Sequence, residues 1–133
     1  MGRAISMRLP ENVSAPVRTN FTPSDLNRLL GNEKRAKSLG QLVRRVIAEV
    51  QSAAKSEGWP LNRIEVNLYQ DPEVTGWEYL VVLMVFDSSF ELANQCLLKL
   101  CYRLDEFSGQ LKAGEADLFR RLIYFDVAAT QTA

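Results

Sequence analysis

The sequence contains no histidine among its 133 residues. This absence excludes Ser–His and Cys–His nucleophile pairs, imidazole acid–base catalysis and metal sites that use histidine. A glycine-rich phosphate loop is also missing, because Gly109 and Gly114 have neither the spacing nor the strand-to-helix context of such a loop. We therefore expect a protein that is not an enzyme and that binds no cofactor.

Cysteine is scarce as well. The two cysteines, Cys96 and Cys101, are five positions apart in a segment whose apolar residues follow the helical period. Zinc sites and redox motifs use shorter spacings and additional partners. We expect both thiols to lie on the apolar face of a helix as small hydrophobic groups, and we expect no metal site.

Long apolar runs are absent too. The longest, residues 79–86, has the length of a strand and falls short of the roughly 18 residues that a membrane helix needs. The N-terminus lacks the continuous apolar segment of a secretory signal. These features predict a cytoplasmic protein without a membrane partner.

The composition that is present is typical of a globular protein, with 47% hydrophobic and 24% charged residues. The length suits a single domain. We expect an extended arm over residues 1–21, one α+β domain over 22–128 and a frayed tail over 129–133. Within the arm, residues 4–9 can add a strand if a sheet edge is available.

Helix signals dominate the first half of the domain. Thr22 is an expected N-cap with Pro23 at the first helical position, and Gly31 supplies a stop. A capping box at 38–41 predicts the start of a long amphipathic helix. This helix is expected to end near Gly58, because glycine provides a left-handed C-cap.

A hairpin follows these helices. Residues 63–69 alternate between apolar and polar side chains, which predicts a strand with one buried face. Turn-forming residues occupy 71–76, and residues 77–86 are apolar on both faces, as in a central strand. We expect the two strands to be antiparallel.

One more long helix and one more strand complete the domain. Ser88 opens a second capping box, and the helix is expected to run to Gly114. A short acidic connection then leads to a strand at 122–127. Because the helix returns the chain, this strand should be parallel to the one at 77–86.

The element order predicts an α+β fold with a three- or four-stranded mixed sheet and two long helices on one face. If residues 4–9 join the sheet, the order resembles the ferredoxin-like β-α-β-β-α-β plan with an extra N-terminal helix. The other face of the sheet, which holds Tyr69, then needs a cover or a partner.

The net charge of zero hides an asymmetry. Residues 1–60 carry ten Lys and Arg against five Asp and Glu, whereas residues 61–133 carry six against eleven. Part of the basic excess forms a candidate surface for an anionic partner, with nucleic acid as one possibility: Arg28, Lys34, Arg35, Lys37, Arg44 and Arg45. The alternative is a solvated helix face without a ligand.

Aromatic residues cluster on the predicted hairpin. Tyr69, Trp77 and Tyr79 either pack across the strands or form a protein interface, since Trp and Tyr are enriched in binding hot spots. The second alternative predicts binding of a protein partner or a homodimer formed through the exposed sheet face or edge.

Residues 64–127, with a hairpin turn at 70–73 and a helix entry at 89–93, resemble small uncharacterised prokaryotic α+β domains, some of which are encoded beside toxin-like partners. The resemblance implies a partner-binding role and transfers no site residues. Our leading hypothesis is a non-enzymatic protein-interaction module, antitoxin-like or accessory in role.

Two alternatives remain open. The first is a nucleic-acid-binding domain that uses the basic N-terminal half. The second is a carboxylate-dependent enzyme built on the acidic residues near the hairpin, which are Asp71, Glu73, Glu78 and Asp87. The second requires two carboxylates to share a pocket, although Asp71 and Asp87 are expected at opposite ends of a strand.

Overall fold

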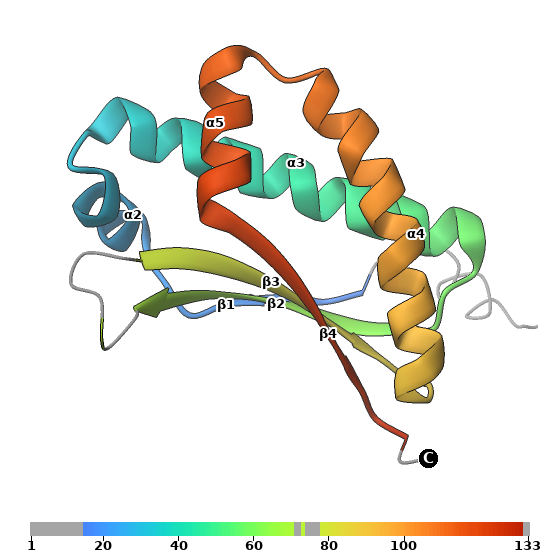
Figure 1. Cartoon of the computed structure of the whole chain (residues 1–133). Helices are drawn as coiled ribbons and strands as arrows, with labels where there is room; N and C mark the ends of the chain where they lie inside the picture. The colour runs from blue at the N-terminus through green and yellow to red at the C-terminus, as the bar shows by residue number, and fades with distance from the viewer. Residues whose placement is uncertain (1–14, 71–72, 74–77, 132–133) are drawn as a thin grey trace, which may run out of the picture.

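The chain forms a strand, two helices, two strands, two helices and a last strand, in that order (Figure 1). The computed structural model describes residues 15–70, 73 and 78–131. Within these residues the elements are β1 (Val17–Thr19), α2 (Pro23–Leu30), α3 (Glu33–Glu57), β2 (Leu61–Gln70), β3 (Glu78–Phe86), α4 (Phe90–Gly109), α5 (Ala113–Leu122) and β4 (Ile123–Ala129).

The four strands form one mixed sheet in the order β1-β2-β3-β4. β1 is parallel to β2, β2 is antiparallel to β3, and β3 is parallel to β4. The α+β class, the hairpin and the parallel pair are therefore confirmed. The ferredoxin-like arrangement is not, because its split βαβ units separate the parallel strands, whereas each crossover here joins direct neighbours.

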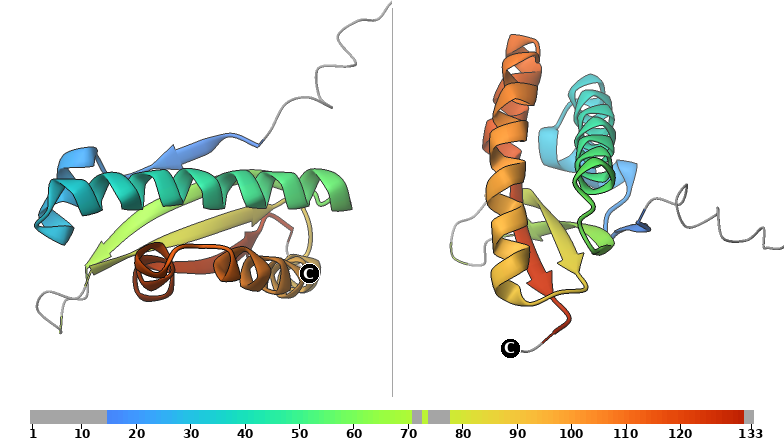
Figure 2. Two further views of the ribbon diagram at one scale, coloured as in Figure 1. Left: turned by 90° about the horizontal axis from the view of Figure 1, so that it is seen from above. Right: turned by 90° about the vertical axis from the view of Figure 1, so that its right-hand side faces the viewer.

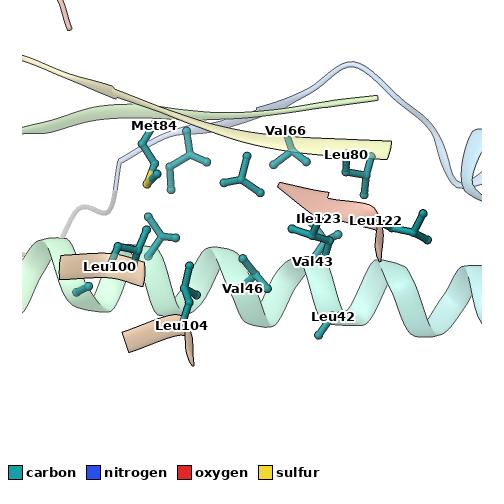
Figure 3. Packing of buried hydrophobic residues seen from close by; sticks show 14 of the residues in the cluster. Leu42, Val43, Val46, Val66, Leu80, Met84, Leu100, Leu104, Leu122 and Ile123 are labelled. Carbon is teal, nitrogen blue, oxygen red and sulfur yellow. The ribbon is translucent and has the colours of Figure 1, made fainter. Parts of the chain in front are cut away.

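The two long helices, α3 and α4, lie on the same side of the sheet, as predicted (Figure 1). Figure 2 shows α3 along the β1–β2 half and α4 with α5 along β4. Between the layers, Val66, Leu80 and Met84 of the sheet face Val46 of α3 and Leu100 of α4 (Figure 3). All five side chains have 0% exposure, so this interface is the core of the domain.

The caps of the first helix agree with the sequence prediction. The Thr22 hydroxyl accepts a hydrogen bond from the Asp25 N–H, and the Asp25 carboxylate accepts one from the Thr22 N–H. These contacts, with the backbone bond first, lower the pKa of Asp25. Gly31 and Gly58 end α2 and α3 with φ angles of 61° and 70°, where glycine avoids the steric cost of a side chain.

The predicted start of α3 at the 38–41 capping box is wrong. The N-cap is Asn32, whose side chain accepts a hydrogen bond from the Arg35 N–H at 3.1 Å. Ala36 is buried against the core, so the first turns already contribute to packing. The helix thus begins at the upstream cap, and Ser38 lies within it.

The predicted single helix from Ser88 to Gly114 is also wrong. Ser89 is the N-cap of α4, α4 ends at Gly109, and a second helix begins at Ala113. The residues expected to form an acidic connection lie inside α5. α5 is stabilised by burying Ala116, Leu118 and Leu122.

The chain ends contribute to the sheet where they are described. Residues 17–19 of the predicted arm form β1, while residues 4–9 lie outside the described range. At the other end, the Thr130 N–H donates to the Phe86 carbonyl at 2.9 Å and the Gln131 N–H donates to that of Ser88 at 3.1 Å. None of the described helices combines the length and apolar character needed to cross a bilayer.

Candidate functional site

One face of the sheet is not covered by any described helix (Figure 1). Leu80 and Val82 of β3 are buried under the helices, and strand alternation places the residues between them on the opposite side. Residues paired in register point to the same face, so the strand pairings identify the residues of the other strands on this side. We call it the open face; it comprises Arg18 of β1, Arg63, Glu65, Asn67 and Tyr69 of β2, Tyr79, Val81, Leu83 and Val85 of β3, and Tyr124, Asp126 and Ala128 of β4.

The open face is polar along β2 and apolar along β3. A sheet with one wet face normally carries polar residues on that face, and β2 follows this rule. β3 departs from it, because Val81 and Leu83 are partly exposed there, while Val85 is 4% exposed. The centre of the open face therefore presents aliphatic side chains to solvent.

Three tyrosines gather at one end of the open face. The rings of Tyr69 and Tyr79 are stacked with centroids 5.9 Å apart, and Tyr79 meets Tyr124 edge to face at 5.0 Å. Tyr69 and Tyr124 remain 48% and 41% exposed. The structure thus brings two predicted interface residues together and adds Tyr124, while Trp77 lies outside the described residues.

The charges on the open face balance. Arg63 and Glu65 form an ion pair at 2.7 Å within β2. Arg18 and Asp126 are exposed on the two edge strands, and the Asp126 carboxylate accepts a hydrogen bond from the Val127 N–H at 2.8 Å. The face therefore carries two arginines and two carboxylates.

Two of the predicted basic residues are engaged in ion pairs within the domain. The Arg28 guanidinium lies 2.9 Å from the Glu78 carboxylate, which also accepts a hydrogen bond from Gln70. Arg45 lies 3.2 Å from Glu115, and its guanidinium carbon is 5.5 Å from the centre of the Phe107 ring. These contacts give both arginines a structural role.

Three others, Lys34, Lys37 and Arg44, are exposed on α3. Their spacing of three and seven residues places them along one side of the helix. Lys37 and Arg44 also line a groove of about 650 Å³ between α2, α3 and the end of β1, together with Phe21 and Ile47. This side of α3 is the remaining candidate for an anionic partner.

Arg35 lies elsewhere, in a hollow of about 530 Å³ that also contains Arg120, Arg121 and Tyr124. Arg121 pairs with Asp117 at 2.8 Å. This hydrogen bond first, and then the charges of Arg121, Arg35 and Arg120, lower the pKa of Asp117. The six predicted basic residues are therefore divided among ion pairs, one side of α3 and this hollow.

The cysteines differ from the prediction. Cys96 is buried, and burial raises the pKa of its thiol. Cys101 is exposed, so its expected place on the apolar face is wrong. It is five residues beyond Cys96, which corresponds to about 140° of rotation around the helix and carries it off the buried stripe.

Two of the acidic residues near the hairpin, Glu78 and Asp87, do not come together. Glu78 and Asp87 lie at opposite ends of β3, where Glu78 pairs with Arg28 and Asp87 accepts hydrogen bonds from Asn62 and Thr130. Asp71 lies outside the described residues. Among the residues that the structure describes, no group of three or more potential ligands could hold a metal ion.

Sequence reasoning missed Tyr124, Asp126, Arg120 and Arg121. The alternation of Ile123, Tyr124 and Phe125 was the available signal for Tyr124, but its place beside Tyr79 depends on the pairing of distant strands.

Comparison with known proteins identifies no relative of this chain. No family model matches it, and neither the curated proteins nor the solved structures contain a match. The resemblance to prokaryotic domains thus stays a prediction, and the function must be inferred from the surfaces described above.

Proposed function

We propose that this chain is a non-enzymatic protein-interaction module whose binding surface is the open face. The observation that carries the proposal is the partly exposed aliphatic centre at Val81 and Leu83, flanked by exposed Tyr69 and Tyr124. Apolar surface that is removed from water stabilises a complex by about 25 cal/mol per Å². Tyrosine also contributes strongly to interface hot spots.

The partner that best fits the open face is a second copy of the chain. Two arginines and two carboxylates give the face no net charge, so two copies experience no general repulsion when their faces meet. A two-fold dimer requires such a self-complementary surface. The basic side of α3, by contrast, would repel its own copy.

The size of the open face predicts modest affinity. Four strands about 4.8 Å apart, with about 3.3 Å per residue over seven residues, give a flat footprint on the order of 400 Å². A standard interface buries about 800 Å² per partner. We therefore expect a reversible dimer that is populated at micromolar concentrations.

Sedimentation velocity over a concentration series tests the proposal. Wild type is expected to shift from monomer to dimer, and Tyr69→Lys is expected to weaken association about tenfold or more, because it places a cation in the interface. Tyr102→Lys is the matched control, since Tyr102 is 79% exposed on α4, away from the open face. A wild-type monomer at high micromolar concentration would contradict the proposal.

The antitoxin-like or accessory role rests on the sequence resemblance alone. It implies that the physiological partner is a toxin-like protein that competes with the second copy for the open face. An affinity pull-down from native cells with wild type and Tyr69→Lys tests this role, since a partner specific to the open face should be lost with the variant and retained with Tyr102→Lys.

A second candidate function is binding of nucleic acid by the exposed side of α3. Lys34, Lys37 and Arg44 form no ion pair with another described residue. Three phosphate contacts predict a slope of about −3 for log affinity against log salt with duplex DNA. A slope near zero in a titration with duplex DNA and with single-stranded RNA would exclude this function.

A further inference from the structure

One row of register-paired residues crosses the open face from β1 to β4 and has residues of opposite charge at its two ends. The register pairs Arg18 with Glu65, Glu65 with Leu83, and Leu83 with Asp126. Three strand spacings of about 4.8 Å separate Arg18 from Asp126 by roughly 14 Å, which is too far for an ion pair within one copy. Both are exposed, and neither forms an ion pair with another described residue.

We propose that two copies of the chain dock face to face around a two-fold axis parallel to the strands, so that Arg18 of each copy meets Asp126 of the other. The proposal rests on the proposed function and specifies its geometry. Rotation about this axis brings β1 of one copy over β4 of the other and keeps the rows in register. Each dimer then contains the Arg18–Asp126 pair twice.

The dimensions of packed sheets permit this contact. Facing sheets lie about 10 Å apart, with strand directions within about 30° of each other. The edge strands lie about 7 Å from the axis, so a rotation of about 30° displaces them by about 4 Å. A long arginine side chain can span the remaining gap to an aspartate.

The same axis gives acceptable contacts at the centre of the interface. Glu65 lies over Leu83 of the second copy, but its carboxylate is already held by Arg63 at 2.7 Å and does not become an unpaired buried charge. Tyr69 lies over Tyr79 of the second copy. The tyrosine clusters of both copies then meet at one end, where aromatic pairs add favourable contacts.

The charges of Arg18 and Asp126 disfavour the other face-to-face dimer in which the strands of the two copies align. An in-plane axis perpendicular to the strands would place β1 over β1 and β4 over β4. Arg18 would then face Arg18, and Asp126 would face Asp126 of the second copy. Like charges across an interface suppress such a pairing, so the row selects the axis parallel to the strands.

Charge reversal tests the arrangement. Arg18→Asp and Asp126→Arg are each expected to raise the dimer dissociation constant about tenfold at low salt, because two attractive pairs become repulsive. The double variant should return to within about threefold of wild type, since it restores both pairs with the signs exchanged. Arg44→Asp is the matched control, because it makes the same charge change on exposed α3.

Three further measurements keep the test independent of folding. Asp126→Asn retains an oxygen that can accept the Val127 N–H while it removes the charge, and it should weaken the dimer. The wild-type dissociation constant should rise with salt, because exposed charge pairs are screened. Thermal unfolding of each variant verifies that the domain is intact.

The outcomes separate this proposal from the more general one. A wild-type dimer that responds to Arg18→Asp no more than to Arg44→Asp overturns the orientation but leaves the open face as the interaction surface. A dimer tightened by Asp126→Asn indicates the perpendicular axis and also overturns the orientation. A wild type that stays monomeric overturns both proposals.

Discussion

The two faces of β3 differ in what they contact, although both are apolar. Leu80, Val82 and Met84 face the helices and are fully buried, whereas Val81 and Leu83 on the open face remain partly exposed. A strand that bordered solvent on one side would normally carry polar residues there. The difference indicates that the helical layer accounts for the stability of the fold, while the apolar residues of the open face are available for association.

The largest expected effect is the difference in alkylation rate between a buried and an exposed cysteine. Cys96 and Cys101 lie on the same helix, but only Cys101 is exposed. Cys96 reacts only when the structure opens, and its raised pKa further reduces the thiolate fraction. We expect Cys101 to be alkylated about a thousandfold faster or more in the native protein, as measured by mass spectrometry over time.

The control for this measurement is alkylation in denaturant, where both thiols should react at similar rates. Similar rates under native conditions would show that the buried side of α4 does not stay packed against the core.

Matched leucine truncations on the two faces should give the next largest effect. Leu80→Ala is expected to lower the free energy of unfolding by about 2–5 kcal/mol, because it leaves a cavity in a fully buried site. Leu83→Ala should cost about 1 kcal/mol or less in dilute solution, since its side chain is already partly exposed. Urea unfolding at low protein concentration measures both.

Repeating the unfolding at high protein concentration sharpens the contrast. The proposed dimer would stabilise the native state by mass action, so wild type should gain stability with concentration and Leu83→Ala should gain less. Equal destabilisation by the two substitutions at low concentration would mean that the two faces do not differ.

The pH response of α5 should give the smallest effect, because its charges lie on the exposed side of the helical layer. The Arg121 hydrogen bond lowers the pKa of Asp117 in the folded state. The stabilisation is therefore present above the unfolded pKa of about 3.9 and is lost as pH falls through the folded value.

Thermal unfolding of wild type and Asp117→Asn at about pH 6 and pH 3 measures this effect. The midpoint difference between the two proteins should shrink at the lower pH. A difference that stays constant would show that the ion pair with Arg121 does not contribute to the pH dependence.

Local sequence signals predicted most of the fold. The Thr22 cap, the Gly58 stop and the alternation in residues 63–69 each depend on neighbours in the chain, and the structure agrees with them. The start of α5 was missed because its N-cap position holds Lys112, which offers no side-chain cap. β1 was missed because the three residues that follow Pro16 become a strand only by pairing with β2.

The candidate site was less predictable because it depends on contacts between distant segments. Tyr69 and Tyr79 could be placed together, since a hairpin pairs nearby residues. The row from Arg18 to Asp126 requires the register of three strand pairs, and no local pattern specifies it. Arg35 seemed part of the basic helix face, but helical rotation carries it to a hollow with Arg120.

The order of strand pairing also has a kinetic consequence. The hairpin closes between Gln70 and Glu78, whereas β1 reaches back 47 residues from Ile64 to Val17 and β4 lies 43 residues beyond β3, from Leu80 to Ile123. Each doubling of the loop length raises the free energy of loop closure by about 0.6 kcal/mol, so pairing of each outer strand costs about 1.5 kcal/mol more than closure of the hairpin. We therefore expect the edge strands to join last and to leave first. Because the edge strands carry Arg18 and Asp126, a folding intermediate without them would lack the complete open face, and the proposed dimer would form only from the finished domain.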